Sequence, residues 1–343
     1  MKIRKEDITP FIENKYITEV KHPQGKLYIY NYTPKAQYER VWTKETLQCR
    51  GLILDELGNI VARPFPKFFN LEEYQEKIPN EPFEVYEKLD GSLGILYFYE
   101  NQPYIATRGS FTSVQASKGN AILYQKYKEN FTKINPKLTY LFEIIYPDNR
   151  IVVDYGNKQD LILLAIIETA TGQEISLNST EAEIGFPVAK CYDGIHDIKF
   201  LKSLETGNQE GFVIRFQSGL RLKVKFEEYK RLHRILTGVS SKSIWEILKD
   251  SKSLEMLLDK VPDEFYQWVE DTKNNLLAEY QVIENQCKEE FKELGDRKET
   301  AVYFQTCKYP SILFAMLDRK DYSQAIWKLI KPKFEKPFCV DES

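Results

Sequence analysis

The sequence is poor in the residues that build disulfide frameworks and histidine-based sites. Its 343 residues include three histidines and five cysteines, and the cysteines are widely spaced without a CxxC pair. An odd number of scattered cysteines argues against a disulfide framework and against a structural zinc site. Three histidines also give little material for a histidine-based metal site or a Ser-His-Asp triad. We therefore expect reduced thiols and a chemistry that uses other side chains.

Long apolar runs are missing as well. The longest aliphatic run covers Leu161 to Ile167 and is closed by Asp160 and Glu168. A membrane-spanning helix needs roughly 20 consecutive apolar residues. The N-terminus, MKIRKEDITPF, carries charges where a signal peptide would have an apolar segment. These absences predict a cytoplasmic protein with no membrane partner.

Aromatic and charged residues are abundant instead. The chain has 22 Tyr, 20 Phe and 4 Trp, and 42% of its residues are hydrophobic, which is enough for a sizeable core. A length of 343 residues suggests two domains, or one large domain with a smaller one. The net charge of −3 excludes a polycation. Any role with nucleic acid must therefore rest on local charge.

The sign of the local charge changes near residue 240. From Arg215 to Lys242 the sequence carries eight basic and two acidic residues, whereas residues 243–343 carry 15 basic and 20 acidic residues. A stretch of small residues from Thr237 to Ser243 coincides with this change and suits a domain connection. We predict one domain over residues 1–238 and a second over residues 239–343.

The two predicted domains differ in their apolar patterns. The first has period-two or continuously apolar runs, which predict strands at 26–32, 51–54, 83–87, 93–99, 140–146, 161–168, 211–216 and 220–225. In the second, apolar residues recur at three- to four-residue steps, which predict helices at 243–258, 265–294, 310–317 and 322–330. The predicted fold class is α+β, with a mixed domain followed by an all-helical one.

A Lys-x-Asp-Gly pattern stands between two of the predicted strands. Lys88-Leu89-Asp90-Gly91-Ser92 follows a strand that ends at Glu87, and Asp-Gly between strands predicts a tight hairpin turn. The ordinary alternative is a solvated lysine beside a turn. Cations close to the Lys88 amine would favour its uncharged, nucleophilic form.

Further charged residues lie in apolar strands downstream. Lys223 and Lys225 are two positions apart in one predicted strand and therefore face the same side. Glu210 opens a strand made largely of apolar residues. Glu143 lies within another apolar strand, where an unpaired carboxylate is costly and a ligand, metal or lysine partner is expected. The alternatives are a solvated strand edge for the two lysines and a structural ion pair for Glu143.

The order and spacing of these motifs resemble the covalent nucleotidyltransferase superfamily, which comprises ATP-dependent ligases and RNA-capping enzymes. The resemblance is closer to the bacteriophage-type RNA ligase 1 family and spans roughly residues 25 to 235. It rests on K-x-D-G-S and on several further motifs. These are Tyr30-Asn31-Tyr32, Cys49-Arg50-Gly51, Arg63-Pro64, Lys67-Phe68-Phe69-Asn70, Arg108-Gly109, Asn149-Arg150-Ile151-Val152, Tyr229 and His233.

This resemblance implies a nucleotidyltransferase domain with ATP-grasp-like antiparallel sheets and flanking helices. It implies an ATP-dependent RNA ligase that joins RNA 3′-hydroxyl and 5′-phosphate ends through a lysyl-AMP intermediate and an adenylylated RNA 5′ end. The RNA would be single-stranded or a nicked loop, with tRNA repair as one use. We expect a monomer.

The resemblance also assigns roles to individual residues. Lys88 would be the nucleophile that attacks the α-phosphorus of ATP. Lys223 and Lys225 would be catalytic lysines that grip the α-phosphate. Arg50 and Lys67 would hold the outgoing β- and γ-phosphates.

The remaining implied contacts involve the ribose, a metal ion and the nucleotide pocket. Glu143 would bind the ribose, and Glu210 would bind Mg²⁺ or Mn²⁺ directly or through water. The residues expected to line the nucleotide pocket are Tyr30, Phe69, Gly91, Arg108 and Tyr229. Core packing is the alternative for the two tyrosines, and Arg108 stands where close relatives are expected to have lysine.

Two other functions stay open at this point. A capping-type RNA guanylyltransferase would use GTP, and a catalytically silent RNA-binding module would keep only the pocket. DNA ligases and capping enzymes place a β-rich domain after the paired lysines, whereas residues 227–236 look helical and no strand series follows. The basic stretch 215–242 suits RNA phosphates or a solvated surface. The helical part suits RNA selection, as in the resembled family, or packing and protein docking.

Overall fold

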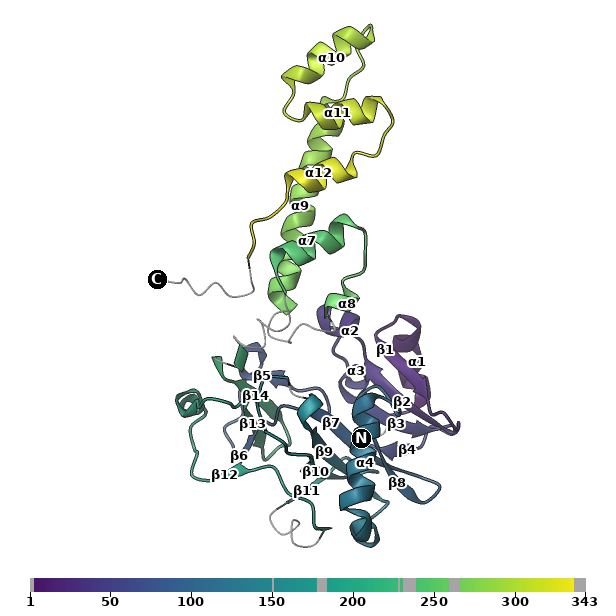
Figure 1. The fold of residues 1–343 in the computed structure, drawn as a ribbon, viewed down its shortest axis with the longest axis vertical. Helices are drawn as coiled ribbons and strands as arrows, with labels where there is room; N and C mark the ends of the chain where they lie inside the picture. Colours follow the sequence, from purple (N-terminus) through teal and green to yellow (C-terminus); the bar gives the residue numbers. More distant parts are fainter. Residues whose placement is uncertain are drawn as a thin grey trace. The chain divides into compact units, whose positions relative to one another are not determined.

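The structure, a computed structural model, describes residues 3–149, 151–177, 184–227, 229–230, 239–258 and 266–335. The chain forms two compact units, Met1–His233 and Arg234–Ser343 (Figure 1). Within the described ranges, no helix is both long enough and apolar enough to cross a membrane. The division lies close to the predicted boundary at 238, and the helical part as an independent domain stays a prediction.

The first sheet of the N-terminal unit is antiparallel, in the order β1-β2-β3-β4. Its strands are Ile17–Lys21, Leu27–Tyr32, Arg50–Asp55 and Ile60–Ala62. Helix α1 (Lys5–Glu13) packs against it through a buried cluster that includes Ile8, Ile17 and Leu52. Two short helices, α2 (Pro34–Tyr38) and α3 (Lys44–Gln48), connect β2 to β3.

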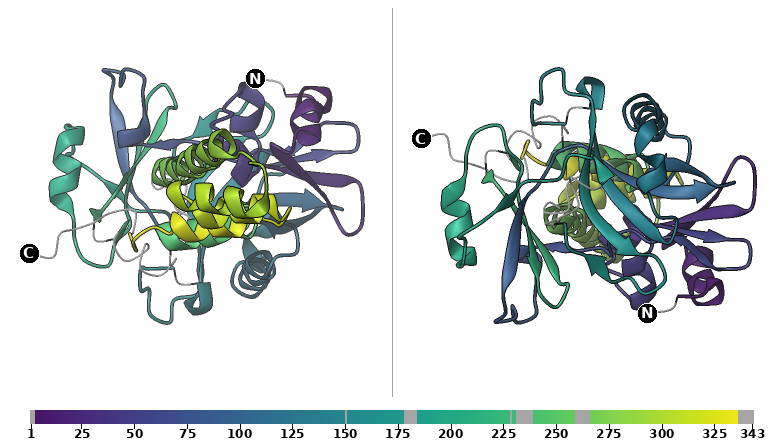
Figure 2. Two further views of the ribbon diagram at one scale, coloured as in Figure 1. Left: turned by 90° about the horizontal axis from the view of Figure 1, so that it is seen from above. Right: turned by 90° about the horizontal axis from the view of Figure 1, so that it is seen from below.

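The second sheet is also antiparallel and has the order β11-β10-β9-β7-β8. In that order its strands are Glu174–Ile175, Asp160–Glu168, Leu138–Ile145, Ser92–Tyr99 and Gln102–Ala106. Helix α4 (Val114–Lys126) covers one face, where its residues Ile122 and Leu123 join a buried cluster with Phe142 and Phe186. Figure 2 shows α4 beside this sheet from two further directions. A short 3₁₀ helix, η2 (Lys128–Lys133), follows α4.

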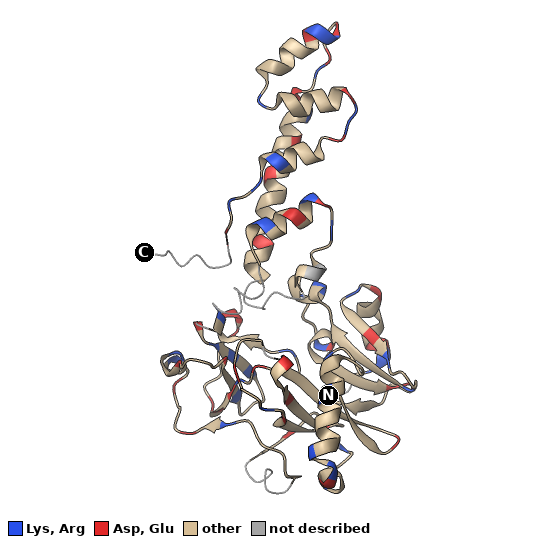
Figure 3. Ribbon diagram, in the orientation of Figure 1, with Lys and Arg blue, Asp and Glu red and all other residues tan. Residues whose placement is uncertain are grey.

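The third sheet has the order β12-β6-β13-β14-β5. Its strands are Cys191–Tyr192, Phe83–Glu87, Gly211–Phe216, Arg221–Lys225 and Phe69–Asn70. All its pairings are antiparallel except β14 with β5, which is parallel. Three further 3₁₀ helices lie in the connections of this unit, η1 (Leu71–Glu73), η3 (Pro147–Asn149) and η4 (Ile198–Leu204). Figure 3 marks the Lys and Arg residues along β13 and β14 in blue.

The predicted hairpin at Asp90-Gly91 is wrong. Strand β6, which precedes it, pairs with β12 and β13, whereas β7, which follows it, pairs with β8 and β9 in another sheet. The Asp-Gly segment therefore carries the chain from one sheet to the other. The pattern placed the end of one strand and the start of the next correctly, but it could not show that the two strands belong to different sheets.

The regular structure described in the second unit is helical. Its helices are α7 (Ser241–Lys249), α8 (Glu255–Leu258), α9 (Tyr266–Glu290), α10 (Arg297–Thr306), α11 (Pro310–Leu317) and α12 (Ser323–Leu329). The single helix predicted over 243–258 is in fact two, because Ser251 adopts a left-handed φ of 52° that no helix accommodates. Trp245 joins α7 to α12 by donating from its indole nitrogen to the Trp327 carbonyl at 2.8 Å.

All eight predicted strands are present, and the mixed class with antiparallel sheets is confirmed. Sequence patterns missed the short strands β1, β4, β5, β8, β11 and β12 and the helices α1, α2, α3, α4 and α10. Of the helix predicted over 227–236, only residues 227, 229 and 230 lie within the described part of the chain, where they are helical.

Candidate active site

Lys88 lies at the end of β6, where two sheets meet. Its backbone nitrogen donates to the Gly211 carbonyl at 2.9 Å. Its amine lies 2.6 Å from Oε2 of Glu210, and the Lys225 amine lies 3.5 Å from the other oxygen of the same carboxylate. The Glu210 side chain is only 4% exposed. One buried carboxylate thus connects the predicted nucleophile to one of the paired lysines.

This arrangement corrects one expectation about Lys88. Its nearest charged neighbour is the carboxylate of Glu210, not a cation. The amine is therefore held in place by an ion pair before any nucleotide is considered. The side chain is 20% exposed, so it does not extend into bulk water.

Glycine at position 211 allows Glu210 to stand beside Lys225. Gly211 pairs with Lys225 across β13 and β14 and has a φ of +142°. A Cβ atom there would lie 1.9 Å from the Val224 carbonyl oxygen. Only glycine permits this close approach of the two strands.

Asp90 connects the K-x-D-G segment to the chain that follows β9. Its Oδ2 accepts from the backbone nitrogens of Val152 at 2.8 Å and Val153 at 2.9 Å. Its Oδ1 accepts from the Tyr229 hydroxyl at 2.9 Å, and its own nitrogen donates to the Tyr155 hydroxyl at 2.8 Å. Asp90 is 3% exposed, so these bonds replace the water it has lost. Asp90 therefore fixes the loop that presents Lys88.

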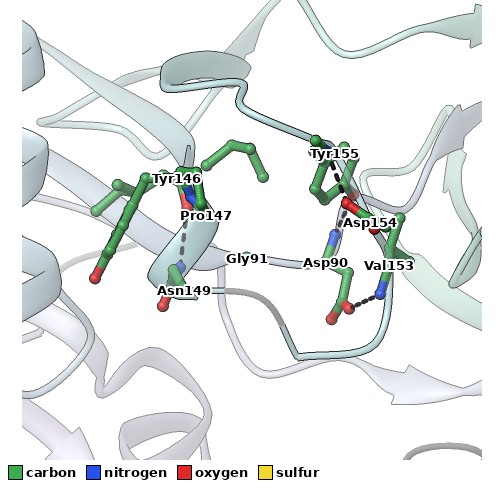
Figure 4. A pocket seen from close by; sticks show the side chains of 11 residues that line it. Asp90, Gly91, Tyr146, Pro147, Asn149, Val153, Asp154 and Tyr155 are labelled. Atoms are coloured by element: carbon green, nitrogen blue, oxygen red, sulfur yellow. Dashed lines mark hydrogen bonds between the residues drawn. The ribbon is translucent and has the colours of Figure 1, made fainter.

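A cavity of about 130 Å³ lies next to this segment (Figure 4). Asp90 and Gly91 form part of its wall, and the residues after β9, including Tyr146, Asn149 and Tyr155, form most of the rest. The Asn149 amide nitrogen donates to the Ile144 carbonyl at 3.1 Å and thereby shapes the turn after β9. The neighbouring Arg150, part of the same motif, lies outside the described residues.

Glu143 of β9 faces the same segment. Its Oε1 accepts from the Gly91 nitrogen at 2.9 Å. A Cβ at Gly91 would lie 2.7 Å from the Ile144 carbonyl oxygen, so glycine allows this contact. Desolvation is the main cause that raises the pKa of Glu143 to about 7; the charge of Lys88 opposes this rise and the charge of Glu210 adds to it.

The raised pKa of Glu143 makes stability depend on pH. Between the ordinary pKa of 4.5 and about 7, the folded chain keeps a proton that the unfolded chain has lost, so stability falls as pH rises through this window. Gln cannot titrate but still accepts from Gly91. From pH 5 to pH 8 we expect the free energy of unfolding of wild type to fall by about 2 kcal/mol more than that of Glu143→Gln. Urea unfolding at both pH values checks this, and parallel profiles would contradict it.

A second group of cations lies among aromatic rings. The Lys67 amine is 5.5 Å from the ring centre of Tyr32, 5.3 Å from Trp42 and 5.5 Å from Phe69. Arg108 lies over the same Tyr32 ring and donates to its hydroxyl at 3.3 Å. Lys67 is 7% exposed. Aromatic faces stabilise cations at such distances, so these side chains are held in place around the Tyr32 ring.

Arg50 and Lys223 share a third ring. The Arg50 guanidinium lies 5.5 Å from the centre of Phe68, and the Lys223 amine lies 5.8 Å from it. Since Lys223 and Lys225 alternate along β14, they face the same side of the sheet. The structure therefore brings Arg50 and the paired lysines toward one region of the N-terminal unit.

Tyr30 occupies a different place from the one expected. It is fully buried in the cluster under α1, and its hydroxyl donates to Glu19 at 2.5 Å. Tyr32, two residues further along β2, reaches the cations instead. The core alternative thus describes Tyr30, and sequence reasoning missed Tyr32 and Trp42. His233 lies outside the described residues.

The predicted metal ligand, Glu210, has no cage of similar ligands around it. Over the described part of the chain, no group of three or more His, Cys, Asp or Glu residues could hold a metal ion. Mg²⁺ and similar ions often bind one or two carboxylates together with water and nucleotide phosphates. Glu210, with Glu143 close by, fits that kind of site.

Comparison with known proteins shows similarity to RNA ligases. The sequence profile of an RNA ligase family matches residues 48–230. A Thermovibrio ammonificans protein whose name assigns it to the RNA ligases is 28% identical over 238 residues, covering 65% of this chain and 60% of its own length. An RNA ligase of Rhodothermus phage RM378 is 26% identical over 345 residues, covering 78% of this chain and 76% of its own. The chain thus spans about 60% of the first relative.

Solved structures of RNA ligases are similar at low identity. A Naegleria gruberi RNA ligase variant with ATP and Mn has a TM-score of 0.37 and 19% identity, and the match covers 44% of this chain and 51% of the other. An archaeal ATP-dependent RNA ligase has a TM-score of 0.46 and 14% identity over 76% of this chain and 70% of the other. The family profile carries the assignment, because it matches more than half of the 343 residues. The chain therefore belongs to the RNA ligase family, as its motifs predicted.

Proposed function

We propose that this protein is an ATP-dependent RNA ligase that works through a covalent lysyl-AMP on Lys88. One observation carries the proposal: the Lys88 amine is held at 2.6 Å from a buried carboxylate that also pairs with Lys225. A solvated surface lysine would not be held by a buried carboxylate in this way. The family assignment supports the same conclusion.

In the first step, the Lys88 nitrogen attacks the α-phosphorus of ATP. A nitrogen–phosphorus bond forms, and the bond to the bridging oxygen of pyrophosphate breaks. An ammonium cannot attack, so Lys88 must lose a proton, and the Glu210 oxygen at 2.6 Å is within reach to accept it. Asp90 keeps the Lys88 loop fixed during this exchange.

The surrounding cations suit the phosphates of the nucleotide. Lys223 and Lys225 would contact the α-phosphate and stabilise the charge that develops on its oxygens. Arg50 and Lys67 would hold the β- and γ-phosphates. Held against aromatic rings, these side chains lose little freedom on binding. A divalent cation at Glu210, Mg²⁺ or Mn²⁺, would supply further positive charge beside the phosphates.

Other residues would hold the nucleoside part. Glu143 would bind the ribose next to Gly91, whose nitrogen donates to the Glu143 carboxylate and whose missing side chain allows this close approach. Phe69, Arg108 and Tyr229 would line the pocket. The Tyr229 ring lies 5.4 Å from the Lys225 amine, and its hydroxyl donates to Asp90.

Two later steps complete the proposed reaction. AMP passes from Lys88 to the 5′-phosphate of an RNA, and a 3′-hydroxyl then attacks that phosphate and expels AMP. Single-stranded RNA or a nicked loop such as that of tRNA is the proposed substrate, and RNA repair is the proposed use. The protein would act as a monomer.

The test is covalent labelling followed by ligation. The full chain is incubated with α-labelled ATP or GTP and with Mg²⁺ or Mn²⁺, then separated on a denaturing gel. We expect ATP to leave acid-labile label on the protein and GTP to leave none. We also expect the protein to join a 5′-phosphate RNA to a 3′-hydroxyl end, in a linear RNA or a nicked tRNA loop. Labelling by GTP alone would indicate a capping-type enzyme, and no labelling would indicate a silent RNA-binding module.

A further inference from the structure

An ion cluster joins the second and third sheets of the N-terminal unit. We call Glu174, Arg221, Arg215 and Glu84 the Glu174 cluster. An oxygen of Glu174 contacts the Arg221 guanidinium, and its other oxygen lies 3.1 Å from Nε of Arg215. Nη1 of Arg215 lies 2.8 Å from Glu84. The side chains of Arg221 and Glu174 are only 10% and 13% exposed.

The members of the Glu174 cluster come from different sheets. Glu174 belongs to β11, at the edge of the sheet that carries Glu143. Arg221 belongs to β14, the strand that carries Lys223 and Lys225. Arg221 and the two lysines alternate along β14, so all three face the same side. The cluster therefore holds one end of the row formed by Arg221, Lys223 and Lys225. At the other end, Lys225 lies beside Glu210, which pairs with Lys88.

The backbone near Glu174 is fixed independently. Arg63 is 8% exposed and donates from Nε to the Thr169 carbonyl at 3.0 Å and from Nη2 to the Ala170 carbonyl at 3.4 Å. These carbonyls lie in the turn between β10 and β11. Two residues after Arg63, the Phe65 ring lies 4.3 Å from the Arg221 guanidinium. Arg221 is thus held between a carboxylate and an aromatic face, and Glu174 stands on an anchored turn.

We propose that Glu174 is a positioning residue of the nucleotidyl-transfer site. By pairing with Arg221 and Arg215 it fixes β14 against the β10–β11 hairpin, and so sets the place of Lys223 relative to Glu143. The ion pair between Glu174 and Arg221 is shielded from water, and charges interact more strongly in such a buried place than at the surface. Phosphoryl transfer requires accurate placement, and a displacement of about 1 Å can cost roughly 100-fold in rate. This inference rests on the proposed function.

The test is Glu174→Gln in the full chain, measured as single-turnover formation of lysyl-AMP. We expect the rate constant at saturating ATP to fall between about 10- and 100-fold. The ATP concentration for half-maximal rate should change less than about threefold, because no nucleotide contact is removed. The final amount of labelled protein should match wild type. A purely structural role would instead lower the labelled fraction and the melting temperature without changing the rate constant, and would overturn the proposal.

Glu84→Gln is the matched control. Glu84 lies opposite Arg215 on the neighbouring strand of the same sheet, so this variant removes one negative charge beside Arg215 without changing the ion pairs that link the two sheets. Its rate constant should stay within about twofold of wild type. An equal loss in both variants would overturn the positioning role. If Glu174→Gln does not fold, Arg221→Lys, which keeps the charge but loses the planar fork, should show an intermediate loss of rate.

The outcomes also separate this inference from the proposed function. Wild type that takes no label from ATP would refute the function itself. If wild type is labelled and Glu174→Gln forms lysyl-AMP with the same rate constant, only the positioning role is refuted.

Discussion

Replacing Lys88 by arginine is expected to abolish covalent labelling by ATP while leaving the fold intact. Arginine keeps a positive charge beside Glu210, so the buried carboxylate retains a partner. A guanidinium stays protonated in proteins and cannot act as the nucleophile. Loss of a nucleophile typically costs well over about 1,000-fold in rate. We expect labelled protein to fall below detection on a denaturing gel.

Two further variants separate the nucleophile from the ion pair. Lys88→Ala should also remain unlabelled, although it leaves Glu210 with Lys225 as its neighbouring amine. Lys126→Ala is the lysine control, because Lys126 pairs with Asp160 and has no proposed role in the reaction, and its labelling should equal that of wild type. Normal labelling of Lys88→Arg would refute the assignment of Lys88. Such a result would move the search to another lysine near the aromatic rings, beginning with Lys67.

Local patterns predicted the strands of the site well. Alternation showed that Lys223 and Lys225 face one side, and the apolar run around Glu143 predicted a buried strand. These predictions succeed because a strand repeats every two residues, whatever its partner is. For Glu143 the sequence predicted a ligand, a metal or a lysine as partner, whereas its carboxylate accepts from the Gly91 backbone nitrogen in the structure.

The features that sequence reasoning missed depend on long-range pairing. The Asp90 segment crosses between sheets because Glu87 pairs with Phe212, more than a hundred residues away. Nothing near position 90 encodes that pairing. The same holds for the bonds from Asp90 to Val152 and Tyr229, which connect three distant segments. These hydrogen bonds of Asp90 can be seen only in the three-dimensional structure, where the sheets are assembled.

One misplacement concerns two tyrosines of the same strand. Tyr30 and Tyr32 are two residues apart, and β2 pairs with β1 in regular register across both, so they are expected to face the same side. Tyr30 nevertheless joins the buried cluster under α1, whereas Tyr32 meets Lys67. Which tyrosine is covered depends on where α1 packs against the sheet, and the alternation along β2 does not encode that.

Replacing Gly211 by alanine is expected to cause the largest loss of stability among these variants. The new Cβ would lie 1.9 Å from the Val224 carbonyl oxygen and 2.9 Å from the Lys225 Cα, both backbone atoms that cannot rotate away. Relief requires β13 and β14 to separate at the point where Glu210 meets Lys225. Strain at φ +142° and overpacking together should cost about 4 kcal/mol. Labelling by ATP should also fall sharply, since Lys88 and Lys225 share Glu210.

Gly219→Ala provides the comparison for backbone strain alone. Gly219 also has a positive φ, +89°, in the turn between β13 and β14, but a Cβ there meets nothing within 4 Å. We expect a loss of about 1 kcal/mol and labelling close to that of wild type. Urea unfolding and single-turnover labelling of both variants measure the two effects. Equal losses would show that conformational strain, rather than the contact with Val224, explains glycine at position 211. A larger loss in Gly211→Ala would show that close strand pairing holds the shared carboxylate between its two lysines.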